Sequence, residues 1–364
     1  MQVDKRVSLT VALVMTLIGI YMATNYFFIS RTTSDASNTN QKVDRVRLAT
    51  VASRYEYGKY GFSDIAVLDN GVVWAVGYDG QDPQRIRYSI DGGNTWEVKP
   101  VQTDGFDLKA ISFPDAKNGW VVGDYGLVLK TSDGGRTWKQ IKVPTQVNLK
   151  VANFVNPQVG YIGGQKGVYH NERKETADFD LVILRTSDGG QSWRTCYEFH
   201  KTGDASRIEK SIWHLATFSE MIAIAIIDGE YLLGTEDGGA TWKIVSPTIK
   251  SGFHSVTFSP DGTGWTVGQK GCFYQSLDKG RTWQRFTNLT ENISNEEWWS
   301  IDFSDSKRGM AVGSQGAIAL THDGGKTWSE VKSGTQEDLR KVKLHGQSGL
   351  ILGSQKVYQV AGDF

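Results

Sequence analysis

One eight-residue pattern recurs six times in this 364-residue chain and constrains its fold more than any other feature. The pattern is Ser or Thr, any residue, Asp, any residue, Gly, any residue, Thr or Ser, and Trp, and we call each copy a box. The box aspartates are Asp91, Asp133, Asp188, Asp237, Asp278 and Asp323, and the box tryptophans are Trp96, Trp138, Trp193, Trp242, Trp283 and Trp328. Successive aspartates are 42, 55, 49, 41 and 45 residues apart, which is the length of a four-stranded propeller blade.

Each residue of the box suits a tight hairpin between two strands. The aspartate can accept hydrogen bonds from the amides of the turn, and glycine adopts positive φ at low cost. The tryptophan can bury its large ring against the hairpin. We therefore expect the boxes to be structural.

A second set of similar segments gives the number of repeats. Seven strand-like segments begin the units, and they start at Phe62, Leu108, Leu149, Trp213, Phe253, Trp298 and Leu339. A second apolar segment follows, mostly ending in glycine, as in GWVVG to Gly123. The last unit has no box, and the stretch RLATVA, around residues 46–52, can supply its missing strand and close a ring. The sequence predicts an all-β fold, a seven-bladed β-propeller over residues 45–364.

The N-terminal segment predicts a membrane anchor. Residues 7–29 form 23 uncharged residues after Lys5 and Arg6, which is long enough to span a bilayer as a helix. The run is longer than a signal-peptide core, so we interpret it as an uncleaved anchor, with a cleaved signal peptide as the alternative. The two basic residues favour a cytoplasmic N-terminus. We expect a cytoplasmic stub and one transmembrane helix over residues 1–29, a flexible tether over 30–44, and a propeller in the periplasm, held at a bacterial inner membrane.

Composition excludes several classes of function. The 40 Lys and Arg residues balance 40 Asp and Glu residues with no basic block, which argues against a nucleic-acid partner. The two cysteines supply neither a disulfide framework nor a Cys-rich zinc site. No carboxylate column accompanies the histidines, so we expect no metal site, and no motif indicates a cofactor.

Six of the seven residues at the second position of the unit-starting segments, all except Ser63, are the candidate binding residues. Aligned from the starts given above, five of the seven residues in this column are basic or His, and the full column is Ser63, Lys109, Lys150, His214, His254, Trp299 and Arg340. The column should lie at the mouth of the central channel, on the face opposite the boxes, where like charges can attract an acidic segment. The alternative is that these side chains are only solvated strand ends. We expect Trp213 and Trp298, in the neighbouring column, to be core residues.

The six boxes, the GW-x-VG segments such as that ending at Gly123, and the seven units resemble the Asp-box (bacterial neuraminidase repeat) propellers. Among these, residues 45–364 are most similar to the photosystem II stability/assembly factor family. The resemblance implies a non-enzymatic scaffold whose partner is a membrane-protein complex or its assembly intermediate, bound through a basic patch. This chain differs from the family in having no lipidation cysteine near its N-terminus.

A sialidase-like or other glycan-active or glycan-binding Asp-box propeller is the alternative. Sialidases need an arginine triad, a tyrosine nucleophile and an Arg-Ile-Pro motif, and the nearest string here, Arg85-Ile86-Arg87, lacks the proline. Other glycosidases need two carboxyl groups facing each other across a cleft, and no spacing in this sequence singles out such a pair. We therefore predict that the chain is not an enzyme.

Overall fold

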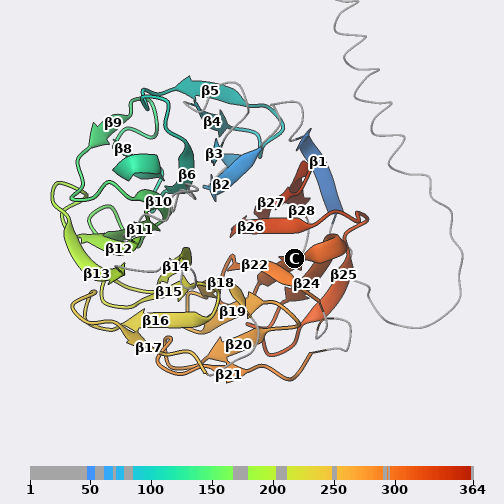
Figure 1. Cartoon of the computed structure of the whole chain (residues 1–364). Coiled ribbons are helices and arrows are strands. Elements are labelled where there is room, and N and C mark those ends of the chain that lie inside the picture. The colour runs from blue at the N-terminus through green and yellow to red at the C-terminus, as the bar shows by residue number, and fades with distance from the viewer. Residues whose placement is uncertain are drawn as a thin grey trace, which may run out of the picture. The chain divides into compact units, whose positions relative to one another are not determined.

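The computed structural model describes residues 47–53, 61–68, 71–77, 85–166, 179–201, 211–247, 252–289, 293 and 296–361. Within the compact unit formed by residues 44–364, these residues build seven four-stranded antiparallel sheets arranged in a ring (Figure 1). The structure therefore confirms the predicted all-β, seven-bladed propeller.

Each blade runs from an inner strand beside the channel to an outer strand at the rim. The inner strands are β2 (Phe62–Val67), β6 (Leu108–Ser112), β10 (Asn148–Phe154), β14 (Ile212–Thr217), β18 (Phe253–Phe258), β22 (Trp298–Phe303) and β26 (Leu339–His345). The second strands are β3 (Val73–Gly77), β7 (Gly119–Gly123), β11 (Gly160–Gln165), β15 (Ala223–Ile227), β19 (Gly264–Gly268), β23 (Gly309–Gly313) and β27 (Ser348–Gly353). The third strands are β4 (Arg85–Ser89), β8 (Val128–Thr131), β12 (Phe179–Thr186), β16 (Tyr231–Thr235), β20 (Phe273–Ser276), β24 (Ala317–Thr321) and β28 (Lys356–Ala361). The outer strands are β5 (Glu97–Pro100), β9 (Lys139–Ile141), β13 (Arg194–Lys201), β17 (Lys243–Ile244), β21 (Gln284–Arg285), β25 (Ser329–Lys332) and β1 (Arg47–Ser53).

The two ends of the propeller meet in one blade. Strand β1 pairs antiparallel with β28, with Leu48 opposite Val360, and so becomes the fourth strand of the last sheet. This pairing confirms the predicted closure, and it covers an edge of β28 that would otherwise be free to pair with another chain.

The boxes form six hairpins with the same hydrogen bonds. In blade 2, Thr131 Oγ1 donates to Asp133 Oδ1 at 2.8 Å and accepts from the amide of Gly135 at 2.9 Å. The amide and hydroxyl of Thr137 donate to the two carboxylate oxygens of Asp133, at 3.0 and 2.6 Å. Equivalent bonds recur in the other five boxes. The hydroxyl and carboxylate groups of each box are therefore hydrogen-bonded within the hairpin, which gives the box a structural role. Among the described residues, buried indole Nε1 atoms without a hydrogen-bond partner belong to Trp96, Trp138, Trp193, Trp242 and Trp328.

Each box also joins its blade to the preceding one. Trp74, Trp120 and Trp265 share a position in the second strands and are fully buried between blades. The second glycine of the box in the next blade lies against the indole ring of each of these tryptophans. A Cβ added to Gly325, for example, whose φ is +85°, would lie 2.1 Å from Trp265 Cζ2. Glycine is required there both for its backbone conformation and for the close approach.

All seven inner strands carry a β-bulge after their first paired residues. The pairing of β6 with β7, for example, shifts between Leu108 and Ala110, and the same shift occurs at the start of the other six strands. The bulge brings the backbone so close that a Cβ on Gly123 would lie 2.1 Å from the carbonyl oxygen of Asp107. Because a bulge redirects the extra side chain, Lys109 and its six equivalents emerge together at one end of the channel.

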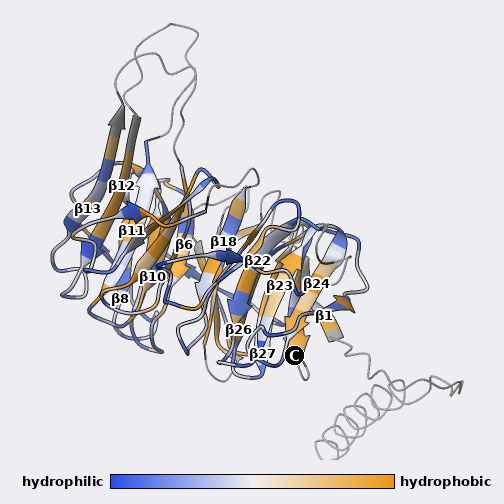
Figure 2. Cartoon of the chain, turned by 90° about the horizontal axis from the view of Figure 1, so that it is seen from below, coloured by the Kyte–Doolittle hydropathy of each residue, from blue (hydrophilic) through white to orange (hydrophobic). Residues whose placement is uncertain are grey.

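The hairpin of β12 and β13 in blade 3 differs from the other outer hairpins. Its strands have eight residues each, whereas β17 and β21 have two. The hairpin extends beyond the neighbouring blades on one side of the ring (Figure 2). Since β13 ends where the chain continues toward β14, this is the side on which the inner strands begin.

The anchor and tether predictions concern residues that the structure does not describe. Among the described residues no helix is long and apolar enough to cross a membrane. Residues 7–29 lie outside them, so the transmembrane helix and the tether over 30–44 stay predictions.

Candidate functional site

The bulge residues form a ring at the channel mouth, which is the candidate site. The seven residues of this mouth ring, in blade order, are Ser63, Lys109, Lys150, Trp213, His254, Trp299 and Arg340. The inner strands begin on this face, whereas the boxes connect the third and fourth strands at the other face. Five of the six predicted binding residues belong to the ring, and His214 does not.

The alignment of blade 4 was wrong by one residue. Ile212 occupies the first position of β14 and pairs with Ile227, so Trp213 takes the bulge position and His214 follows it. In blades 3, 5 and 6 a phenylalanine ends the inner strand, but in blade 4 the equivalent Phe218 lies in the turn after the strand. The prediction that Trp213 is a core residue is also wrong, because its side chain is 45% exposed. Trp298 is buried, as predicted.

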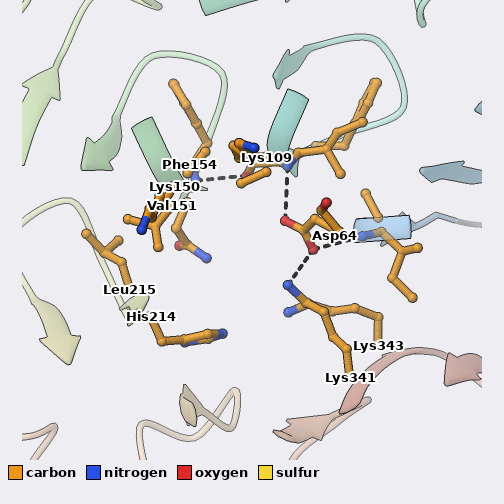
Figure 3. Close-up of a pocket in the computed structure, with 18 of the residues that line it drawn as sticks. Asp64, Lys109, Lys150, Val151, Phe154, His214, Leu215, Lys341 and Lys343 are labelled. Atoms are coloured by element: carbon orange, nitrogen blue, oxygen red, sulfur yellow. Dashed lines mark hydrogen bonds and ion pairs between the residues drawn. The ribbon is translucent and has the colours of Figure 1, made fainter. Parts of the chain in front are cut away.

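His214 lies deeper in the channel than the mouth ring. Its imidazole is directed toward Lys341 and Lys343 (Figure 3). Burial, helped by the charges of these two lysines, holds the pKa of His214 well below its usual value. Its Nδ1 has no hydrogen-bond partner among the described residues. At neutral pH His214 is therefore uncharged and adds nothing to the positive charge of the mouth.

Four successive members of the ring stack on one another. The His254 ring lies between Trp213, with centroids 5.6 Å apart, and Trp299, with centroids 4.5 Å apart and planes 5° from parallel. The Arg340 guanidinium lies 5.2 Å from the Trp299 centroid. His254 is buried, and its Nδ1 donates to the Trp298 carbonyl at 3.0 Å. Burial lowers its pKa, so the stack contains a neutral imidazole at neutral pH. We call Trp213, His254 and Trp299 the aromatic arc.

Lys109 and Lys150 form the basic part of the ring. Lys109 Nζ lies 2.7 Å from Asp107 Oδ2 and 3.6 Å from Asp124 Oδ2, so its charge is largely balanced. Lys150 is exposed and has no ion-pair partner in the part of the chain that the structure describes. Desolvation and the neighbouring Lys109 lower the pKa of Lys150, and the charge of Asp124 offsets part of this shift.

The remaining cation of the ring is also paired. Arg340 Nη2 lies 3.1 Å from Asp338 Oδ2. The ring therefore carries less excess positive charge than its column of basic residues suggests, and Lys150 is its main uncompensated cation.

The mouth ring borders two cavities that share lining residues. A mouth cavity of about 470 Å³ is lined by the aromatic arc on one side and by Lys109 and Lys150 on another. A channel cavity of about 360 Å³ is lined by Lys109, Lys150 and Trp213 as well as by the deeper His214, Asp64 and Lys341. Trp213 and both lysines thus border the two cavities.

The buried carboxylates of the channel hold blades together. Asp64 accepts the amides of Ile65 at 2.8 Å and Ile111 of the next blade at 3.0 Å, and it pairs with Lys341 (Figure 3). Asp302 accepts the amide of Leu344 at 2.9 Å and lies 3.9 Å from Lys343. Both carboxylates are therefore committed to the backbone of a neighbouring inner strand and to a lysine. Among the described residues no group of three or more His, Cys, Asp or Glu side chains could hold a metal ion.

The sequence is similar to a family model and to two photosystem II assembly factors. Residues 97–172 and 288–361 match the family model described as photosynthesis system II assembly factor YCF48. The photosystem II assembly lipoprotein Ycf48 of Synechococcus sp. (strain CC9902) is 24% identical over 207 residues, which cover 56% of this chain and 55% of that protein. The photosystem II stability/assembly factor HCF136 of Oryza sativa subsp. japonica is 24% identical over 222 residues, which cover 59% of this chain and 43% of that protein. The chain thus spans about half the length of these two relatives.

Solved structures are similar in fold. A structure described as YCF48 bound to D1 peptide has a TM-score of 0.66 and 19% identity, covering 92% of this chain and all of that one. The GH74 enzyme of Niastella koreensis has a TM-score of 0.60 and 16% identity, covering 86% of this chain and 53% of that one. At these identities the likeness shows the fold alone. The six boxes, the seven blades and the sequence matches together identify this chain as an Asp-box propeller similar to the photosystem II assembly factors.

Proposed function

We propose that this chain is a scaffold that holds a segment of a membrane protein at the channel mouth while a membrane complex is assembled. The observation that carries the proposal is the mouth cavity, where the exposed Trp213 and the uncompensated Lys150 face the same space. Exposed aromatic side chains and unpaired cations are typical of surfaces that contact another protein. The similar structure described as YCF48 bound to D1 peptide supports a peptide as the ligand of this fold.

The membrane location is part of the same proposal. Residues 7–29 would hold the chain in the membrane, and Lys5 and Arg6 would keep its N-terminus in the cytoplasm. The propeller would then lie outside the cytoplasm, in the periplasm of a bacterium. A scaffold anchored in this way meets membrane proteins as they are inserted.

The proposed action is binding rather than catalysis. A glycosidase of the paired-carboxylate kind needs two carboxyl groups free to exchange protons or attack a sugar. Asp64 and Asp302 are instead hydrogen-bonded to backbone amides and paired with lysines. Glycan binding is the second candidate, because sugars stack on exposed rings such as that of Trp213 and because the GH74 propellers share the fold.

Capture of a membrane partner tests the proposal. The full chain, purified in detergent, is used as bait for solubilised membranes of its source, next to a variant in which Lys109, Lys150 and Arg340 are changed to Gln. The matched control changes three exposed lysines away from the mouth, Lys139, Lys142 and Lys332, to Gln. We expect the wild type and the control to recover the same membrane protein and the mouth variant to lose it, with thermal stability unchanged in both variants. Equal capture by all three would contradict the proposal, and binding to a glycan array without protein capture would favour the second candidate.

A further inference from the structure

We infer that the mouth recognises two features of one extended peptide, an acidic side chain and a nearby aromatic side chain. This inference rests on the proposed function and specifies the chemistry of the segment that is held. It follows from the division of the mouth ring into an aromatic side and a basic side, which share one cavity.

Trp213 is held in place as a platform for an aromatic side chain. Its Nε1 donates to Ser211 Oγ at 2.6 Å, and one face of its ring stacks on His254. The edge of the ring lies so close to Gly229 that an added Cβ there would be 3.1 Å from Trp213 Cζ3. A ring fixed on one face and at its edge loses little conformational entropy when a ligand packs on its remaining surface.

The exposure of Trp213 supports a binding role. Trp299, the other tryptophan at a bulge position, is half-buried, and Trp74, Trp120 and Trp265 in the second strands are fully buried. Burying the exposed part of Trp213 would be favourable, because apolar area contributes about 25 cal/mol per Å² when it leaves water. A planar, apolar group of the ligand would remove this area from water.

Lys150 would attract a negatively charged side chain of the same peptide. It lines the same cavity as Trp213, and the carboxylate that acts on it, Asp124, is shared with Lys109. Lys109 adds to this side but is balanced by Asp107 and Asp124. An added carboxylate beside the ammonium group of Lys150 would favour its charged form, which desolvation and the charge of Lys109 disfavour.

The shape of the mouth favours an extended chain over a compact ligand. A third cavity, of about 270 Å³, lies against the aromatic arc, and Ser63, Arg340 and Lys341 are among the residues that line it. The aromatic arc therefore separates a hollow with Lys109 and Lys150 from a hollow with Arg340. A peptide crossing the mouth can place an aromatic side chain on the arc and acidic side chains beside either hollow.

Four labelled peptides of equal length test the inference with the full chain in detergent micelles. In a Gly and Ser background, their central motifs are Glu-Ser-Phe, Glu-Ser-Ala, Gln-Ser-Phe and Gln-Ser-Ala, and fluorescence anisotropy gives their affinities at low and high salt. We expect Glu-Ser-Phe to bind most tightly, with the change from Phe to Ala weakening it about fivefold. The change from Glu to Gln should remove most of the salt dependence.

Two variants assign the two features to their residues. Trp213→Ala should abolish the preference for Phe over Ala while the salt dependence remains, and Trp213→Phe should restore part of that preference. Lys150→Gln should reduce the salt dependence and keep the preference for Phe, whereas the control Lys139→Gln should change neither. Circular dichroism and melting curves confirm that each variant is folded.

The outcomes separate this inference from the proposed function. Wild-type protein that shows no preference for Phe, or a preference that persists in Trp213→Ala, overturns the two-feature site even if a membrane partner is captured. Loss of membrane-protein capture with the peptide preferences intact would instead contradict the assembly role and leave the two-feature site standing.

Discussion

The two faces of the propeller are built on the same repeat but use it differently. On the box face, six hairpins repeat both the backbone path and the side-chain hydrogen bonds, so that each aspartate bonds the Thr or Ser four residues later. On the mouth face, seven bulges repeat only the backbone path, and the residue presented varies among Ser, Lys, Trp, His and Arg. The difference indicates that the hairpin on the box face requires particular side chains, whereas the bulge on the mouth face accepts several residue types, so the mouth residues are free to serve binding.

The same substitution on the two faces should give very different losses of stability. Trp265→Ala removes a fully buried ring that packs on Phe303 and Trp328, and we expect it to lower the free energy of unfolding by about 3–5 kcal/mol. Trp213→Ala removes a ring that is 45% exposed and should cost about 1 kcal/mol or less. Urea unfolding of both variants checks the comparison. If Trp213→Ala lowered the free energy of unfolding as much as Trp265→Ala, the aromatic arc would be part of the core.

As the pH is lowered, the groups near the channel mouth should lose their contribution to the stability of the fold before the box aspartates lose theirs. Burial lowers the pKa of His214 and His254 below 6.5, so these residues bind protons more readily in the unfolded chain. Their contribution to stability is therefore complete above about pH 6.5 and declines as the pH falls below that value. Hydrogen bonds from Ser192 lower the pKa of Asp188 to about 2, from an ordinary value of 3.8. The contribution of Asp188 to stability is therefore complete above pH 3.8 and is lost as the pH falls toward 2.

Unfolding midpoints measured from neutral to strongly acidic pH check this order. We expect a first decline in stability below about pH 6.5 that is smaller in His214→Gln than in the wild type. The second decline in stability, which comes from protonation of the box aspartates at more acidic pH, should be unchanged by this substitution. If the stability of His214→Gln declined below about pH 6.5 as much as that of the wild type, His214 would not be the source of this decline.

The fold could be predicted because its signals are local and repeated. The box residues determine a hairpin within eight positions, and their spacing counts the blades. Closure by β1 followed from the missing fourth strand of the last unit. The glycines at or near the ends of the second strands also mark the bulges, since most of them leave room for a close carbonyl oxygen, as at Gly123.

The mouth was predicted less completely, because its properties depend on single residues and on contacts across the sequence. Blade 4 has Ile227 where other second strands have glycine, and Phe218 in the turn, so its register was assigned one residue too late. The pairing of Lys109 with Asp124 depends on a turn between two strands and could not be seen in the column of basic residues. The stacking of His254 between two tryptophans of neighbouring blades likewise appears only when the ring is closed.

The smallest expected effect concerns the charges of the mouth. Asp107→Asn removes the nearer partner of Lys109, whose Nζ lies 2.7 Å from Asp107 Oδ2, and leaves Asp124 at 3.6 Å. Both members of the pair are about one-third exposed, so the loss in the free energy of unfolding should be under about 1 kcal/mol. The same change in a box, Asp323→Asn, weakens the bonds from both the amide and the hydroxyl of Thr327 and should cost more.

Binding should respond in the opposite direction. Asp107→Asn leaves the positive charge of Lys109 less balanced, so an acidic peptide should bind more tightly and with a steeper dependence on salt. Affinity measured at two salt concentrations, together with urea unfolding, checks both effects on the same variant. If Asp107→Asn destabilised the protein as much as Asp323→Asn and left peptide binding unchanged, Asp107 would be a structural residue like the box aspartates. The distinction between a face built for folding and a face free to bind would then be wrong at this position.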